Sequence, residues 1–347
     1  MECIEKELLN FRHIFRLTDD TGMFQHSKYG VPDPSKGYTT DDNARALIAA
    51  VMIYEKYKQS EYLDLIYRYA SFLLNAQNEV GKFKNFMDYN RNFVEEEGSE
   101  DCFGRCLWAL GYTVAAPTVP QNVKAACKSM LKKALPNVEH LKFIRGKAYS
   151  IIGLSYMDGN DIRQYIETLA SSLVEEYHKH SEDQWNWFEE SVIYCNAVMP
   201  WALFKAYRVL GEQQLLDIAI KSMKFLEKET FTESYFQPIG CKGWLEKNQQ
   251  GALYDQQPVE ACEMLLACLE AYKVTGDVHY LKRANDCFEC YKGKNCKGLC
   301  LIDHETGGCY DGITEEGLNY NQGAESLISY YISYITIMGY NNLLIIR

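Results

Sequence analysis

The sequence has few residues that interrupt helices. It contains only eight prolines and 23 glycines in 347 residues, fewer than the roughly 12% of Pro plus Gly that average usage gives. A basic surplus is also missing, because 47 acidic residues against 36 basic ones leave a formal charge of −11. Proteins that bind nucleic acid or anionic lipid need clustered Lys and Arg. We therefore expect a mostly helical protein that binds neither nucleic acid nor membranes.

Long apolar runs and the pattern of a secretory leader are missing as well. No window approaches about 18 apolar residues without a charge, so no membrane-spanning segment is expected. Met1 is followed by Glu2 and Glu5 rather than by a basic end and an apolar run, which is unlike a signal peptide. The 13 cysteines are an odd number and favour free thiols in a reducing compartment. The expected location is the cytoplasm.

Four of the cysteines lie close together in the sequence and raise the question of a zinc site. They are Cys287, Cys290, Cys296 and Cys300. Common zinc motifs usually separate two close cysteine pairs by a dozen or more residues, and this spacing does not match them. We therefore expect structural thiols here, with no metal and no organic cofactor.

A unit of two helices recurs along the sequence. The first helix of each unit is apolar on nearly all sides and contains small residues, which is typical of a helix buried between others. We expect these helices at residues 44–57, 106–116, 147–156, 192–207, 259–272 and 324–334. The second helix is amphipathic, with one apolar stripe at helical spacing. Clear cases are residues 61–74, 161–177 and 214–226.

Six buried helices that alternate with surface helices predict an all-α fold, the (α/α)6 toroid, in a single domain over residues 1–347. Five surface helices follow their buried partners along the chain. The sixth is expected at residues 3–17, where Ile4, Leu8, Phe11 and Phe15 form an apolar stripe. This N-terminal helix would close the outer ring.

In such a ring, the N-termini of all six inner helices point to one mouth. The loops that lead into them are rich in carboxylates, arginine, amides and aromatic residues. Such a set binds sugars, because charged and amide groups hydrogen-bond to hydroxyls and aromatic faces stack on the C–H side of the sugar ring. Single acids at these positions could serve only as helix caps or as favourable first-turn charges. Capping does not require Arg45 three residues after Asp42, or Arg105 four residues after Asp101. Each of these pairs lies on one helix face.

Several strings in these loops resemble one family. They are YTTDDNARAL, GKFKNFMDY, SEDCFGRCLWALG, WNWFE followed by NAVMPWAL, YDQQPVEA, GGCYDG and NYNQGAESL. The sequence is similar to the little-characterised glycosidase-like six-hairpin family, which occurs alone or joined to sugar-nucleotide glycosyltransferases. The resemblance extends from Asp20 to Tyr334. It implies the same (α/α)6 fold, work on carbohydrate and a glycosyltransferase as an expected partner. The sequence departs from the family pattern at Lys84, where a histidine is typical.

Glycoside cleavage needs two carboxyl groups that flank the scissile bond. We predict Asp42 and Glu189 as this pair, because they enter from different helices and could face each other across a sugar; Asp101 is the next candidate. Glu189 and Asn196, seven residues apart, are expected to share a helix face. The expected substrate contacts are His26, Arg45, Arg105, Trp187, Asp255, Gln256, Gln257, Glu260, Asp311, Asn321, Gln322 and Glu325.

The leading hypothesis is a glycoside hydrolase-like enzyme that acts on a short oligosaccharide without a cofactor. Two alternatives stay open. A sugar epimerase or isomerase would abstract a proton beside a carbonyl, generally with histidines at the mouth, and only His26 and His304 could reach it. A non-catalytic module that binds a glycan or partners a glycosyltransferase would use the same aromatic and amide side chains.

Overall fold

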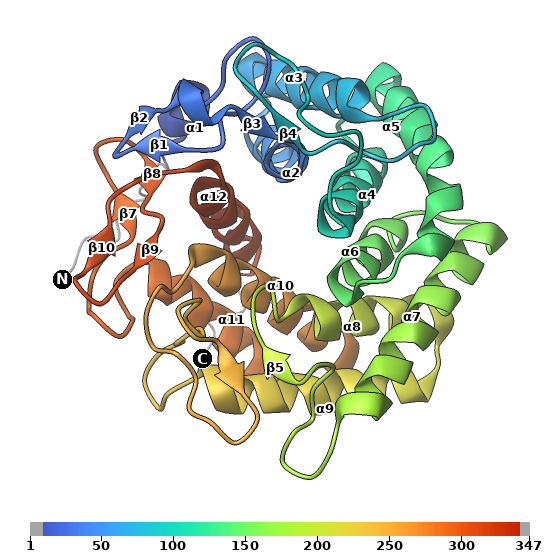
Figure 1. The fold of residues 1–347 in the computed structure, drawn as a ribbon, viewed down its shortest axis with the longest axis vertical. Coiled ribbons are helices and arrows are strands. Elements are labelled where there is room, and N and C mark those ends of the chain that lie inside the picture. The colour runs from blue at the N-terminus through green and yellow to red at the C-terminus, as the bar shows by residue number, and fades with distance from the viewer. Residues whose placement is uncertain (1–9, 341–347) are drawn as a thin grey trace.

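The computed structural model describes residues 10–340 as a double ring of helices. The inner ring consists of α2 (Thr40–Tyr57), α4 (Glu100–Ala115), α6 (Ile144–Leu154), α8 (Val198–Leu210), α10 (Pro258–Thr275) and α12 (Ala324–Met338). The outer ring consists of α3 (Ser60–Ala76), α5 (Gln121–Ala134), α7 (Asn160–His180), α9 (Gln213–Thr230) and α11 (Val278–Tyr291), together with the short α1 (Arg12–Arg16). Figure 1 shows the inner helices around a central axis, with the outer helices farther from that axis. The predicted (α/α)6 toroid is confirmed.

The expected N-terminal helix is only partly within the described residues. Residues 3–9 lie outside them, and the helix that is described, α1, is one short segment. Just before it, the ring of Phe11 packs edge-on against Tyr331 of α12, with 5.0 Å between the ring centroids. Phe11 also contacts Tyr57 of α2. The chain therefore covers the seam between the first and the last inner helix.

The burial of the helices follows the sequence patterns. Outer helix α3 buries Tyr62, Ile66, Tyr69 and Leu73 along one stripe, whereas inner helix α4 buries every residue from Cys102 to Gly111. An amphipathic helix has one dry face, and a helix apolar all round has to lie between other helices. This difference in burial sorts the helices into the two rings.

Inner helices α4 and α6 approach each other very closely, because both carry glycines two turns apart. A Cβ atom at Gly111 of α4 would lie 2.1 Å from the carbonyl oxygen of Gly153 of α6, and a Cβ at Gly153 would lie 2.4 Å from the backbone of Leu107. Gly104 and Gly146 meet in a similar way one level nearer the mouth. The two backbones touch where side chains would otherwise separate them.

Gly111→Ala should destabilise the protein although alanine is the better helix former by ~1 kcal/mol. The added methyl group would force α4 and α6 apart, and overpacking of this kind typically costs about 1–3 kcal/mol. Gly251→Ala is the control, since its Cβ would meet only ordinary contacts from 3.5 Å outward. Chemical denaturation of both variants measures the difference. Equal or higher stability of Gly111→Ala would contradict the close approach.

One inner helix begins later than predicted. Helix α8 starts at Val198 rather than at residue 192, because residues 191–192 form strand β5 (Ser191–Val192), which pairs with β6 (Leu245–Glu246). Backbone paired in this extended form cannot join a helix. Glu189 and Asn196 are therefore not on one helix face, and that prediction is wrong. Asn196 is buried in the loop before α8 and donates to the carboxylate of Glu260 (3.3 Å).

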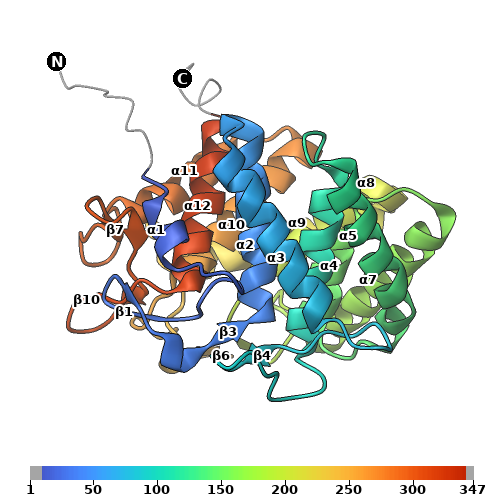
Figure 2. The ribbon, with the colours of Figure 1, turned by 90° about the horizontal axis from the view of Figure 1, so that it is seen from above.

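Short strand pairs occur in the loops. Besides β5 and β6, the pairs are β1 (Ser27–Lys28) with β2 (Val31–Pro32), β3 (Tyr38–Thr39) with β4 (Phe86–Met87), β7 (Ile302–Asp303) with β8 (Gly308–Cys309), and β9 (Gly312–Ile313) with β10 (Leu318–Asn319). Figure 2 shows β1, β3, β4, β6 and β10 at one end of the ring. These loops build the mouth. Among residues 10–340, no helix is both long and apolar enough to cross a membrane.

Candidate active site

The mouth holds a cavity of about 300 Å³ where α2, α10 and α12 begin. We term it the Asp42 cavity. It is lined by Gln25, His26, Asp41, Asp42, Arg45, Gln257, Pro258, Asp311, Asn319, Gly323, Glu325 and Ser326. Six of the predicted site residues therefore gather here: His26, Asp42, Arg45, Gln257, Asp311 and Glu325.

The start of α2 places two neighbouring carboxyl groups in this cavity. Thr39 caps the helix, and its hydroxyl donates to Asp42 Oδ2 (2.6 Å). One turn later, Arg45 Nη2 lies 2.8 Å from Asp42 Oδ1, and its Nη1 lies 3.0 Å from Glu325 of α12. Asp41 accepts a hydrogen bond from Nη1 of Arg105, a residue of α4, at 2.5 Å. Each carboxyl group is thus oriented by a buried arginine.

The two neighbours have opposite pKa shifts. Burial, together with the adjacent charge of Asp41, raises the pKa of Asp42 to about 7. Burial alone would raise the pKa of Asp41 as well, but the charges of Arg105 and Arg45 outweigh it and lower that pKa below its ordinary value. At neutral pH, one carboxyl group can hold a proton while its neighbour is ionised. Such separation of two pKa values is a pattern of acid–base sites.

Asp41 is the acidic residue of this cavity that the sequence analysis missed. As a first-turn acid it is also expected in any helix, because it complements the helix dipole. What distinguishes it is Arg105, which reaches it from another helix 64 residues along the chain. The Asp-Asp pair next to Arg45 was the available signal.

Beneath the Asp42 cavity lies a buried polar layer. Arg105 donates to the hydroxyl of Tyr149 (3.4 Å) and to the thiol of Cys195 (3.2 Å). Tyr149 in turn donates to the carboxylate of Glu263. The backbone N–H of Cys195 donates to Glu260 (2.5 Å), and burial, with the charge of Glu263, raises the pKa of Glu260 to about 8. Glu260 thus binds the loop before α8 rather than lying open at the surface.

A second cavity, of about 720 Å³, lies where α4 and α6 begin. We term it the Arg145 cavity. It is lined by Ser99, Glu100, Asp101, Lys142, Phe143, Ile144, Arg145, Glu176, His180, Phe188, Glu189, Glu190, Ser191, Ile193 and Tyr194. Arg145 binds Glu189 with both terminal nitrogens, at 3.0 and 2.8 Å. Asp101 accepts a hydrogen bond from the hydroxyl of Tyr194 at 2.8 Å.

Asp42 and Glu189 therefore line different cavities. The prediction that they face each other across one sugar does not fit this arrangement. The reason is local: Glu189 precedes strand β5, and Arg145 of α6 holds its carboxylate on that side of the mouth. Asp101, the next candidate, lines the same cavity as Glu189.

Several predicted substrate contacts serve the fold instead. Trp187 is 0% exposed and packs against Phe188 and Phe225, so its prediction as a sugar contact is wrong. Gln256 is buried and donates to the carbonyl of Leu253 (2.8 Å). The buried Gln322 donates to Asp303 (2.7 Å).

Two further predicted contacts lie in the loops of the mouth. Asn321 accepts a hydrogen bond from the backbone N–H of Tyr29 (2.9 Å) and so ties the turn between β1 and β2 to the loop before α12. Asp255 has a left-handed backbone, with φ at 60°, and its carbonyl accepts from the N–H of Cys241 (3.1 Å). His304 lies in the turn between β7 and β8 and does not line the Asp42 cavity.

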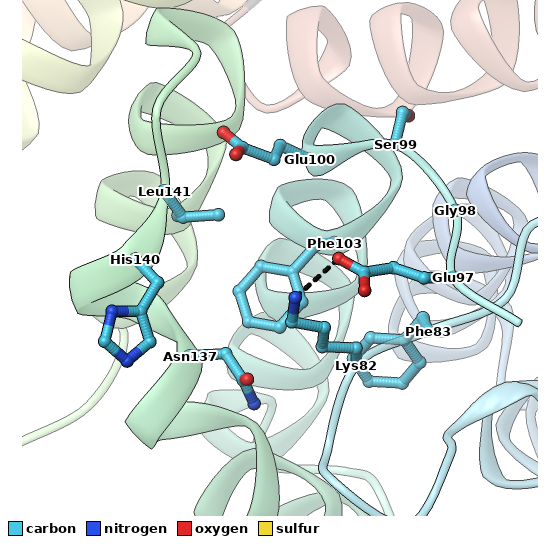
Figure 3. Close-up of a pocket in the computed structure, with 10 residues that line it drawn as sticks. All are labelled: Lys82, Phe83, Glu97, Gly98, Ser99, Glu100, Phe103, Asn137, His140 and Leu141. Carbon is cyan, nitrogen blue, oxygen red and sulfur yellow. Dashed lines mark hydrogen bonds and ion pairs between the residues drawn. The ribbon is translucent and has the colours of Figure 1, made fainter.

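A third cavity beside α4 is too small for a sugar. Its volume is about 30 Å³, enough for only one or two waters. Figure 3 shows Lys82 and Glu97 joined across it, with 2.6 Å between Nζ and Oε1, next to the rings of Phe83 and Phe103. The ion pair of Lys82 and Glu97 links two parts of the loop that precedes α4.

Every cysteine among residues 10–340 is a free thiol. Within that range, no group of His, Cys, Asp and Glu side chains is arranged to hold a metal ion. Cys287 and Cys290 are buried in α11, and burial raises the pKa of both thiols. They behave as core residues.

Comparison with known proteins identifies the class of fold. No family model and no curated protein matches the chain. A sugar epimerase from a ruminal bacterium is similar in structure, with 16% identity over 95% of this chain and 97% of that one and a TM-score of 0.73. The cellobiose 2-epimerase of Bacillus thermoamylovorans has 13% identity, coverage of 94% and 95%, and a TM-score of 0.73. An α-mannanase of glycoside hydrolase family 76 from Bacteroides thetaiotaomicron has 14% identity, coverage of 88% of each chain and a TM-score of 0.60.

These likenesses show the fold. The chain has the (α/α)6 toroid that sugar epimerases and glycosidases share, as the resemblance in its sequence implied. Shared fold does not determine the reaction, which depends on the groups in the site.

The raised pKa of Asp42 predicts a pH-dependent stability. Because the folded state holds this proton more tightly than the unfolded state, stability falls as pH rises from about 4 to the folded pKa of about 7. Asp42→Asn removes this contribution, so the loss of melting temperature between about pH 5 and pH 8 should shrink. Asp277→Ala, which deletes an exposed cap of α11, should keep the wild-type difference. An unchanged pH dependence in Asp42→Asn would show that Asp42 titrates normally.

Proposed function

We propose that the protein is a glycoside hydrolase-like enzyme that acts on an oligosaccharide bound in the Asp42 cavity. The observation that carries this proposal is the Asp41–Asp42 pair, whose pKa values lie on opposite sides of the ordinary value. Asp42 donates its proton to the glycosidic oxygen as the bond breaks. Ionised Asp41 stabilises the positive charge that develops on the sugar or takes a proton from the attacking water.

The surroundings of the pair support this division of roles. Arg105 keeps Asp41 ionised through a contact of 2.5 Å, and burial keeps the proton on Asp42. Asp311 and Gln257 line the rest of the cavity and offer an acceptor and an amide to sugar hydroxyls. Asp311 is itself fixed, since it accepts from the N–H of Gly323 (2.7 Å). Because these side chains are already ordered, a sugar binds to them without the entropic cost of fixing their conformations.

Epimerisation or isomerisation of a sugar is the second candidate. It is favoured by structures described as a cellobiose 2-epimerase and a D-mannose isomerase, whose TM-scores against this chain are 0.73 and 0.72. His26 is exposed and lines the Asp42 cavity, and it could take a proton from the carbon beside a carbonyl. The Asp41–Asp42 pair would then orient the open-chain sugar.

A product screen in D₂O separates the candidates. The wild-type protein is incubated with a panel of neutral oligosaccharides, and the products are analysed by NMR and mass spectrometry. The hydrolase proposal expects shorter sugars without deuterium on carbon. An isomer that carries deuterium at the inverted carbon, or at the former carbonyl carbon that is reduced in an aldose–ketose exchange, would establish epimerisation or isomerisation instead. Saturable binding with no turnover would make the protein a glycan-binding module.

We further propose a cytoplasmic location and a glycosyltransferase partner. The free buried thiols support the first. The resemblance to domains that are joined to glycosyltransferases supports the second. Fractionation of cells and purification of the tagged chain, followed by identification of a co-purifying glycosyltransferase, test both.

A further inference from the structure

The Arg145 cavity has no role in the reaction proposed for the Asp42 cavity, yet the two are neighbours on one face. Asp101 and Arg105 lie one turn apart on α4. Asp101 lines the Arg145 cavity, and Arg105 contacts Asp41 of the Asp42 cavity. A chain of sugar residues that leaves one cavity along the mouth therefore meets the other.

An exposed aromatic ring stands on the rim of the Arg145 cavity. Phe143, directly before α6, is 68% exposed. The backbone that carries it is held, because the carboxylate of Glu100 accepts hydrogen bonds from the N–H groups of Lys142 and Phe143, at 2.8 and 2.7 Å. A large aromatic side chain exposed to water on a fixed backbone offers a flat stacking surface.

The other exposed aromatic residues favour the same face. Among residues 10–340, four other exposed aromatic side chains lie in loops at the mouth end: Tyr29, Phe86, Tyr89 and Tyr320. Two more, Phe15 and Tyr67, belong to outer-ring helices. Aromatic rings gathered around a polar mouth are suited to the C–H faces of several sugars.

The floor of the Arg145 cavity presents fixed polar groups. Arg145 and Glu189 hold each other through two contacts, and Arg145 Nε also donates to the carbonyl of Tyr194 (2.6 Å). Tyr194 donates to Asp101. Hydroxyl groups of a sugar can donate to these carboxylates. No movement is needed to form the set.

The charge of the lining selects among glycans. The carboxylates are Glu100, Asp101, Glu176, Glu189 and Glu190, against the cations Lys142 and Arg145. An acidic, partly desolvated cavity repels uronic, sulfated and phosphorylated sugars. The Asp42 cavity is acidic too, since Asp41, Asp311 and Glu325 face Arg45.

We infer that the Arg145 cavity is a second sugar-binding subsite, which takes an uncharged residue of the same glycan with the ring of Phe143 as its stacking surface. The inference rests on the proposed function in that the Asp42 cavity holds the reacting part of this glycan. Its consequence is that the natural substrate is a neutral oligosaccharide long enough to span both cavities.

Glycan binding tests the subsite without requiring turnover. The full-length Asp42→Asn protein is titrated with an array of neutral and uronic-acid oligosaccharides, from disaccharides upward. Longer neutral oligosaccharides should bind more tightly than disaccharides. Phe143→Ala, added to this protein, should weaken the longer ones by about 10-fold, or ~1.4 kcal/mol, and leave the disaccharides unchanged. Tyr67→Ala removes an exposed ring from outer helix α3 and is the matched control, which should change neither.

The results that overturn the subsite differ from those that overturn the reaction. If Phe143→Ala binds every length as its parent does, or if uronic oligosaccharides bind better than neutral ones, the subsite is wrong even when the wild-type protein hydrolyses glycans. If the wild-type protein turns over no glycan but its binding still depends on length and on Phe143, the reaction is wrong and the subsite stands.

Discussion

Asp42→Asn should lower kcat/KM by about 10²–10⁴-fold while the protein stays folded, because removal of a general acid typically costs this much. The amide has nearly the shape of the protonated carboxyl group, so it can keep the contact with Thr39. It has no proton to give to the leaving oxygen. Circular dichroism, and melting curves at about pH 5, where the folded protein holds the proton on Asp42, should therefore resemble those of the wild-type protein, and only the rate on the glycan identified in the product screen should fall.

Asp277→Ala provides the comparison for this variant. Asp277 caps α11 by accepting a hydrogen bond from the N–H of His279 (2.9 Å). It lines neither the Asp42 cavity nor the Arg145 cavity. Loss of a cap costs about 1 kcal/mol of stability and should leave the rate unchanged. If Asp42→Asn behaves like this cap variant, with lower stability and full activity, Asp42 is a structural residue and the proposed reaction fails.

The fold could be predicted because burial leaves a direct trace in the sequence. A helix such as α4, packed on every side, has few charges anywhere, whereas α3 shows one apolar stripe. The boundary of α8 could not be predicted in this way. Val192 fits the apolar pattern of a buried helix, and only the pairing of residues 191–192 with β6, more than 50 residues later in the chain, makes them a strand.

The site was predictable in its composition but not in its pairings. Loops before inner helices had to reach the mouth, so Asp42, Arg45 and Glu325 were identified. Which carboxylate meets which arginine depends on the rotation of each helix in the ring. Arg145 forms an ion pair with Glu189, and Arg105 forms one with Asp41. Both pairs join different elements, so residue spacing within one helix does not predict them. Trp187 shows a related difficulty, because an aromatic residue near the mouth has the same sequence signal whether it stacks on sugar or fills the core.

Arg105→Met should be among the most destabilising single changes at the mouth. Arg105 is 6% exposed and contacts Asp41, Tyr149 and Cys195. Its removal leaves the carboxylate of Asp41, which is 17% exposed, with the more distant Arg45, at 4.0 Å, as its nearest cation. Removal of one partner of a buried charged pair typically lowers the free energy of unfolding by about 3–5 kcal/mol. The pKa of Asp41 should then rise because burial is no longer opposed by the nearer guanidinium, and the activity should fall together with the stability.

Arg91→Met is the matched control for this change. Arg91 also contacts an aspartate, Asp20, at 2.8 Å, but the two side chains are 57% and 72% exposed. Water and salt screen such a pair, and its loss should cost no more than about 1 kcal/mol. Urea denaturation of both variants at low and high salt measures the difference. Should Arg105→Met prove unable to fold, Arg105→Lys, which keeps the charge, should recover part of the stability; a stable and fully active Arg105→Met would mean that Asp41 does not depend on its partner from α4.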